Sequence, residues 1–132
     1  MVYTVLVVDD DEVTRKTYGE VLAAKGYEVS YAKDGELAVG LYQQRPYSVV
    51  IVDLVMPKKN GFQVIEDIRK MDHNARIIAI TGKSPEHLYL AEEKGANKVL
   101  VKPVRPLELL QVVNDVRRMT RGWDDIKKFD FR

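Results

Sequence analysis

The sequence predicts an α/β domain in which a doubly wound parallel sheet of five strands is covered by five helices. Short β-branched apolar runs alternate with longer stretches that carry one apolar stripe at helical spacing. The runs are almost continuously apolar, which is typical of strands buried on both faces of a parallel sheet. Glycine and proline stand where helix ends use them.

Five segments favour strands. Four of them are strongly apolar and the second along the chain is more polar. The five segments are Val5–Val8, Tyr27–Tyr31, Val49–Val52, Ile77–Ile80 and Val99–Val101. This alternation with helices predicts right-handed crossover connections, with ligands bound beyond the carboxyl ends of the strands.

The stretches between and after these strands favour helices. Four of them carry an apolar stripe, made of Val13, Thr17, Val21 and Leu22, then Leu37, Leu41 and Tyr42, then Val64, Ile65, Ile68 and Met71, and finally Leu109, Val113 and Val116. The remaining helix is predicted from its ends. Ser84-Pro85-Glu86 is typical of a cap, a first-turn proline and a first-turn acid, and Gly95, like Gly26, stands where a helix end takes a left-handed residue.

The composition narrows the class of protein. The 132 residues suit one domain, and 45% hydrophobic with 31% charged residues is typical of a soluble protein. No apolar run reaches the roughly 18 residues of a membrane span, and no signal peptide is visible at the start, so we expect a cytoplasmic protein without membrane contact. A net charge of +1 gives no reason to expect direct nucleic-acid binding, and the absence of cysteine excludes thiolate sites.

Polar residues follow four of the predicted strands. Asp9-Asp10 follows the first, Asp53 the third, Thr81 the fourth and Lys102 the fifth. A single acid at such a position is usually the N-cap of the next helix, and we assign that role to Asp11. Because neighbouring strands lie roughly 4.8 Å apart, the acids after the first and third strands are expected to meet.

Such a carboxylate cluster implies a cation. Two carboxylates about 6 Å apart repel by about 3 kcal/mol at an effective dielectric of about 20. Oxygen ligands with room for water suit Mg²⁺ better than Zn²⁺, and Mn²⁺ is an acceptable substitute. Lys102 and Thr81 are suited to bind phosphoryl oxygens, and the Asp53 carboxylate can act as the nucleophile that forms an acyl phosphate.

At these residues the chain resembles the response-regulator receiver family, and the resemblance covers residues 3–118. Each motif alone is weak evidence, whereas four in order on one α/β pattern are specific. The matching motifs are Asp9-Asp10, then Asp53-Leu54-Val55-Met56-Pro57 with Asn60-Gly61, then Thr81-Gly82, and then Lys102-Pro103. The resemblance implies a flavodoxin-like fold with strand order 2-1-3-4-5 and a cis peptide before Pro103.

The resemblance also implies a role for each acid. Asp53 is expected to be the phosphoacceptor and a metal ligand. Asp10 is expected to bind Mg²⁺ directly, Asp9 through water, and Val55 through its main-chain carbonyl.

A switch follows from the resemblance. We expect Thr81 to move inward when Asp53 is phosphorylated, and the face formed by the fourth helix, fifth strand and fifth helix to repack as the output surface. Val99 stands where many members carry a rotating aromatic residue, so Val99 is at most a weak part of the switch. The expected partners are a sensor histidine kinase or a histidine phosphotransfer protein, and an output protein or domain.

Alternatives remain open. The chain could be an interaction module that needs no phosphorylation or, less in keeping with the motifs, a Mg²⁺-dependent hydrolase. We expect a switch that catalyses only its own phosphorylation and dephosphorylation. Residues 1–120 are predicted to form the receiver domain, and 121–132 a tail that packs back, binds a partner or begins a linker. His73 and His87 are assigned no function.

Overall fold

The computed structural model describes residues 2–82 and 84–119, and its helices and strands alternate strictly along the chain. The strands are β1 (Thr4–Val8), β2 (Glu28–Ala32), β3 (Val49–Asp53), β4 (Ile77–Thr81) and β5 (Lys98–Val101). The helices are α1 (Glu12–Ala23), α2 (Gly35–Gln44), α3 (Gly61–Met71), α4 (Pro85–Lys94) and α5 (Pro106–Arg117). All ten predicted elements are therefore confirmed.

The sheet is parallel throughout, with the strand order β2-β1-β3-β4-β5. This confirms the expected order and the doubly wound, flavodoxin-like class. The order reverses between β1 and β3, where Val8 pairs with Val52. In such a fold the carboxyl ends of these two strands border the crevice in which ligands bind.

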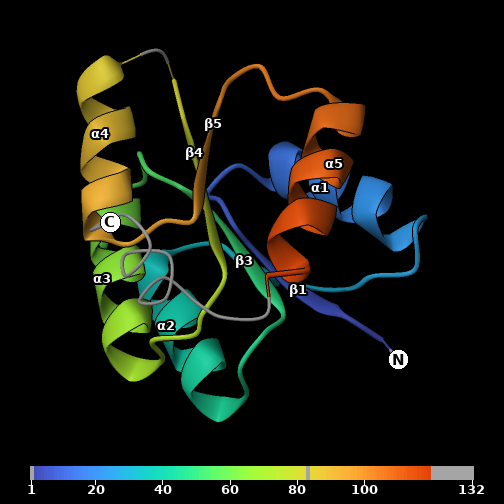
Figure 1. Ribbon diagram of the computed structural model, residues 1–132, viewed down its shortest axis with the longest axis horizontal. Helices are drawn as coiled ribbons and strands as arrows, with labels where there is room; N and C mark the ends of the chain where they lie inside the picture. The colour runs from blue at the N-terminus through green and yellow to red at the C-terminus, as the bar shows by residue number, and fades with distance from the viewer. Residues whose placement is uncertain (1, 83, 120–132) are drawn as a thin grey trace, which may run out of the picture.

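Helices cover both faces of the sheet, as Figure 1 shows: α2, α3 and α4 on one face, α1 and α5 on the other. Each face has its own apolar core. The first includes Leu6, Val50 and Val52 with Val64 and Ile68 of α3. The second is made of side chains that alternate with these along the strands and of the buried residues of the other two helices, among them Val7, Ile51, Leu22, Leu109 and Val113.

The predicted stripe is only partly right in two helices. In α1 Leu22 is buried as predicted, but Val13 is 71% exposed, Thr17 is exposed, and Tyr18 and Gly19 are buried instead. In α2 Tyr42 is buried as predicted, but Leu37 is exposed and Ala38 is buried. The stripe in α3 is right except for Met71, which is exposed, and the stripe in α5 is right throughout. Sequence spacing alone does not tell which side of a helix meets the sheet.

Local side chains and a glycine set several helix ends. The Asp11 side chain accepts from the N–H of Thr14 over 3.1 Å, which confirms Asp11 as the N-cap of α1. Asn60 and Gln63 form a reciprocal capping box at the start of α3. Ser84 occupies the N-cap of α4 without a capping hydrogen bond from its side chain, and Gly95 ends that helix in the left-handed conformation at φ 116°.

Two further predictions concern membrane spans and the C-terminal tail. No helix formed by residues 2–82 and 84–119 is long and apolar enough to cross a membrane. The proposed tail at 121–132 lies outside the described residues.

Candidate functional site

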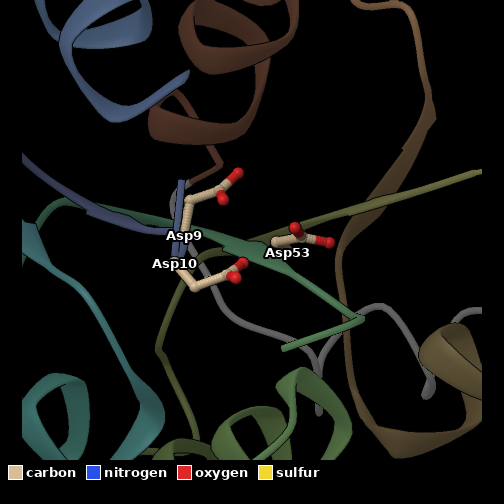
Figure 2. Close-up of side chains that lie close together, drawn as sticks. All are labelled: Asp9, Asp10 and Asp53. Atoms are coloured by element: carbon tan, nitrogen blue, oxygen red, sulfur yellow. The ribbon is translucent and has the colours of Figure 1, made fainter. Parts of the chain in front are cut away.

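Three carboxyl groups meet at the carboxyl edge of the sheet. Asp9 and Asp10 follow β1, Asp53 ends β3, and Figure 2 shows their side chains around a common space. One oxygen of each lies within 4.8 Å of one oxygen of each other. Asp9 and Asp53 are buried, with 3% and 4% exposed, whereas Asp10 is exposed. Two of the three carboxyl groups are thus buried, and the cluster is open to solvent on the side of Asp10.

The strands themselves place these acids. The N–H of Asp9 donates to the Ala32 carbonyl over 3.1 Å, which extends the pairing of β1 with β2 by one residue. Asp53 pairs with Ile80 in the register of β3 and β4. Because β1 and β3 are neighbours, the residues at the carboxyl ends of these two strands lie side by side. The Asp9 carboxylate also accepts from the N–H of Asp11 over 2.9 Å, which holds it in place.

The electrostatics of the cluster are unfavourable without a positive partner. Burial raises the pKa of Asp9 from the ordinary 3.8 to about 6, and the nearby negative charges of Asp53 and Asp10 act in the same direction. The N–H of Asp11 and the charge of Lys102 oppose this rise. Burial, with the charges of Asp9 and Asp53, also raises the pKa of Tyr18 to about 12. The site therefore favours added positive charge.

Lys102 provides one positive charge. Its Nζ lies 3.2 Å from Oδ2 of Asp53, and its side chain is 42% exposed while that of Asp53 is 5% exposed. The N–H of Lys102 donates to the Thr81 carbonyl over 2.8 Å, so β4 supports the backbone at this point. The peptide bond between Lys102 and Pro103 is cis, as expected.

The other Asp53 oxygen faces the backbone. The N–H of Val55 donates to Oδ1 of Asp53 over 3.1 Å, which places residue 55 beside the carboxylate, while the Val55 side chain is 61% exposed. Gly61 begins α3 against Asp53, because a Cβ at Gly61 would lie 2.3 Å from the Asp53 carbonyl oxygen. The start of α3 thus packs directly on the backbone of Asp53.

Thr81 is fully buried at the end of β4, and its hydroxyl has a partner that the sequence did not suggest. Thr81 Oγ1 lies 3.3 Å from Nδ1 of His87 in α4. The His87 ring also packs edge-on against Phe62, with centroids 5.4 Å apart. The sequence signal for this contact is a histidine in the first turn of the helix that follows Thr81. Val99 is half-buried and packs on the same apolar core as Phe62.

The donor set suits a small, hard cation. It consists of carboxylate oxygens, includes the Asp9 carboxylate, whose pKa is raised by burial and by its acidic neighbours, and leaves an open side for water. Mg²⁺ prefers such ligands and retains several waters. Among the described residues the cluster consists of aspartates alone, without the histidine or thiolate ligands that a structural zinc site uses. The residues therefore fit Mg²⁺.

Comparison with known sequences identifies the family. A sequence model of the response regulator receiver domain matches residues 5–114, which include all the acids described above as well as Thr81 and Lys102. The chain belongs to the response regulator receiver family. Receiver domains are signalling switches that work with kinase and output partners.

Curated relatives support this family. The chemotaxis protein CheY of Thermotoga maritima is 33% identical over 116 residues, covering 86% of this chain and 97% of that protein. The protein CcdB of Bacillus subtilis is 35% identical, covering 85% and 95%. The probable transcriptional regulator ycf27 of Guillardia theta is 40% identical, but this chain spans only 46% of its length. Receiver domains thus occur both in short proteins and as parts of longer ones.

Solved structures share the fold. The chemotaxis protein CheY4 of Vibrio cholerae superposes with a TM-score of 0.82 at 32% identity, covering 88% of this chain and 99% of that one. A response regulator described as putative, from Chloroflexus aurantiacus, gives a TM-score of 0.85 at 28% identity, covering 89% and 98%. The flavodoxin-like receiver fold is therefore confirmed by structure as well as by sequence.

Proposed function

We propose that this receiver is a phosphorylation-controlled switch in which Asp53 accepts a phosphoryl group from a phosphohistidine. The donor would be a sensor histidine kinase or a histidine phosphotransfer protein. The observation that carries this proposal is the position of Lys102 Nζ, 3.2 Å from Asp53 Oδ2, beside two further carboxylates within 4.8 Å. A nucleophile, a cationic group and a cation site are combined there, as phosphoryl transfer requires.

The transfer uses the Asp53 carboxylate as nucleophile. One of its oxygens attacks phosphorus, the bond between phosphorus and the donor imidazole nitrogen breaks, and the electron pair leaves with the imidazole. Lys102 then passes from the carboxylate to a phosphoryl oxygen, and the Thr81 hydroxyl donates to another. The buried position of Asp53 keeps the nucleophile in one orientation.

A divalent cation would complete the site. Mg²⁺, with Mn²⁺ as a substitute, would be held by Asp10, Asp53 and the Val55 main-chain carbonyl, and by Asp9 through water. When bound, it supplies charge neutralisation for the phosphoryl oxygens.

The cycle closes by hydrolysis. Water attacks phosphorus, the bond to the Asp53 oxygen breaks, and inorganic phosphate leaves while the carboxylate is restored. The chain is then the substrate of its own chemistry rather than an enzyme that turns over a separate substrate. We place this switch in the cytoplasm, without direct binding to nucleic acid.

We propose that the output protein or domain binds the face formed by α4, β5 and α5. This face exposes apolar side chains, with Tyr89 65% exposed, Leu90 38% exposed and Val101 37% exposed. Thr81 lies at the end of β4, directly beside β5 in the sheet. A change at Thr81 is thus made next to the surface that an output protein or domain would contact.

The proposal is tested by intact mass after incubation with acetyl phosphate and Mg²⁺. A phosphoryl adduct is expected in the wild type, absent with EDTA and absent in Asp53→Asn. Asp115→Asn, which changes an exposed acid on α5, is the matched control and should still form the adduct. No adduct with acetyl phosphate or with any of a panel of histidine kinases would favour a phosphorylation-independent interaction module instead.

A further inference from the structure

His87 connects the buried hydroxyl of Thr81 to α4. Its Nδ1 lies 3.3 Å from Thr81 Oγ1, and its ring meets that of Phe62 at an interplanar angle of 72°. Phe62 belongs to the first turn of α3, which packs on Asp53 through Gly61. One half-buried side chain thus contacts both the end of β4 and the start of α3.

The rest of α4 buries little apolar surface. Among its residues only Ala91 is buried, whereas Tyr89 is 65% exposed and Leu90 38% exposed. The Ser84 side chain does not cap the helix. An element with so little buried apolar surface moves at low cost in free energy. The far end of α4 is held by the ion pair of Lys94 with Glu66 and by the Gly95 carbonyl, which accepts from Arg69. The contact of His87 with Thr81 therefore makes up a large share of what positions the first turn.

We propose that His87 is a positioning residue that holds the Thr81 hydroxyl toward α4 in the unphosphorylated protein and loses that contact on phosphorylation. This inference rests on the proposed function. A hydroxyl has one hydrogen to donate, and a phosphoryl group at neutral pH offers oxygens that mainly accept. In the proposed arrangement Nδ1 of His87 accepts the hydrogen of the Thr81 hydroxyl, so this bond is lost when Thr81 donates to the phosphoryl group instead. The first turn of α4 is then released.

The same arrangement indicates which ring takes the role of the aromatic residue that β5 lacks. Val99 packs on the core shared by Phe62 and Ala91 and has no aromatic ring to turn. The ring that contacts Thr81 comes from α4 instead. Phosphorylation would therefore be sensed directly by α4 and not through a rotating side chain on β5.

The test measures the affinity of the full chain for trifluoroberyllate, an acyl-phosphate mimic, in Mg²⁺ at about pH 8, where histidine is ordinarily neutral. His87→Phe keeps a ring against Phe62 but removes the acceptor. Because one hydrogen bond no longer competes for Thr81, we expect about fivefold tighter binding. His87→Asn keeps a polar atom near the position of Nδ1 and should return the affinity toward that of the wild type.

Two further readouts separate positioning from a general structural effect. In a Thr81→Val background, His87→Phe should no longer change the affinity. In the free wild type, ¹⁵N shifts of the His87 ring should show Nδ1 without a hydrogen. Urea unfolding of each variant checks that it is folded.

The possible failures are distinguishable. If the folded wild type does not bind trifluoroberyllate while Asp53 is intact, the proposed function fails and the inference fails with it. If the wild type binds and His87→Phe binds equally or more weakly, or if Nδ1 carries the hydrogen, the inference alone is overturned.

Discussion

Lys102 Nζ lies 3.2 Å from Asp53 Oδ2, and this ion pair joins the ends of two strands that are not neighbours. Asp53 ends β3, Lys102 follows β5, and β4 lies between them. The lysine therefore reaches across the end of β4, where its own N–H donates to the Thr81 carbonyl. A phosphoryl group on Asp53 would be met by groups from three successive strands.

Removing the Lys102 charge should slow the chemistry far more than it affects the fold. We expect Lys102→Met to reduce the rate of phosphorylation by acetyl phosphate about 10²-fold, because a positioned donor to the developing phosphoryl charge is lost. Lys98→Met, which changes an exposed lysine at the start of β5, is the control. Equal rates for the two variants, measured by intact mass over time, would remove Lys102 from this role.

The raised pKa of Asp9 predicts a stability change with pH. The folded protein holds the Asp9 proton up to about pH 6, whereas the unfolded chain releases it near 3.8. The unfolded chain thus binds fewer protons in this window, and the contribution of Asp9 to stability falls as pH rises through it. Asp9→Asn removes this penalty. In EDTA, its gain in free energy of unfolding over the wild type should grow by about 1–2 kcal/mol from about pH 4.5 to about pH 7.5.

Urea unfolding of the wild type and Asp9→Asn at the two pH values provides the measurement. Adding Mg²⁺ at the higher pH should reduce the difference, because a bound cation stabilises the Asp9 carboxylate in the wild type. A gain that is the same at both pH values would mean that Asp9 titrates alike in the folded and unfolded chains.

A side chain at position 61 is expected to destabilise the protein. A Cβ there would lie 2.3 Å from the Asp53 carbonyl oxygen and 2.6 Å from the Leu54 Cα, and backbone cannot turn aside as a side chain can. Gly61→Ala should lower the free energy of unfolding by about 2–3 kcal/mol and slow phosphorylation by shifting α3 against Asp53. Gly40→Ala, inside α2 with nothing within 4 Å, should instead raise it by about 0.5–1 kcal/mol. Chemical denaturation of both variants provides the measurement. Similar losses of free energy of unfolding in both would contradict the role given to packing at Gly61.

Arg69 is expected to be structural. Its guanidinium donates to the carbonyls of His73, Ala75 and Gly95 and to the side chain of Asn97, at 2.6–3.1 Å. Arg69→Met leaves these acceptors without that donor and should lower the free energy of unfolding by about 2–4 kcal/mol. Lys70→Met, at the exposed neighbouring position, should change it little. Thermal or urea unfolding tests this, and a near-zero effect of Arg69→Met would show that water replaces the arginine.

Much of the fold was predictable because its signals are local. Continuous apolar runs marked four of the strands, and Gly95 and Asp11 marked helix ends through their own backbone and side-chain chemistry. The buried side of α1 was not predictable in the same way. Val13 belongs to the same apolar stripe as Leu22, yet Val13 is exposed and Tyr18 is buried beside Leu22. Which side is buried depends on where α5 and the sheet lie, and spacing contains no information about them.

The sequence by itself determined which acids could meet. In a parallel sheet all strands end at one edge, so Asp9, Asp10 and Asp53 had to emerge there once β1 and β3 became neighbours. Only the tertiary structure decided how Thr81 and Arg69 are engaged. Their partners His87 and Gly95 come from α4 and its end, and the packing of that helix on the sheet and on α3 brings them within hydrogen-bond distance. These contacts depend on how α4 packs, and the order of residues along the chain does not specify that packing.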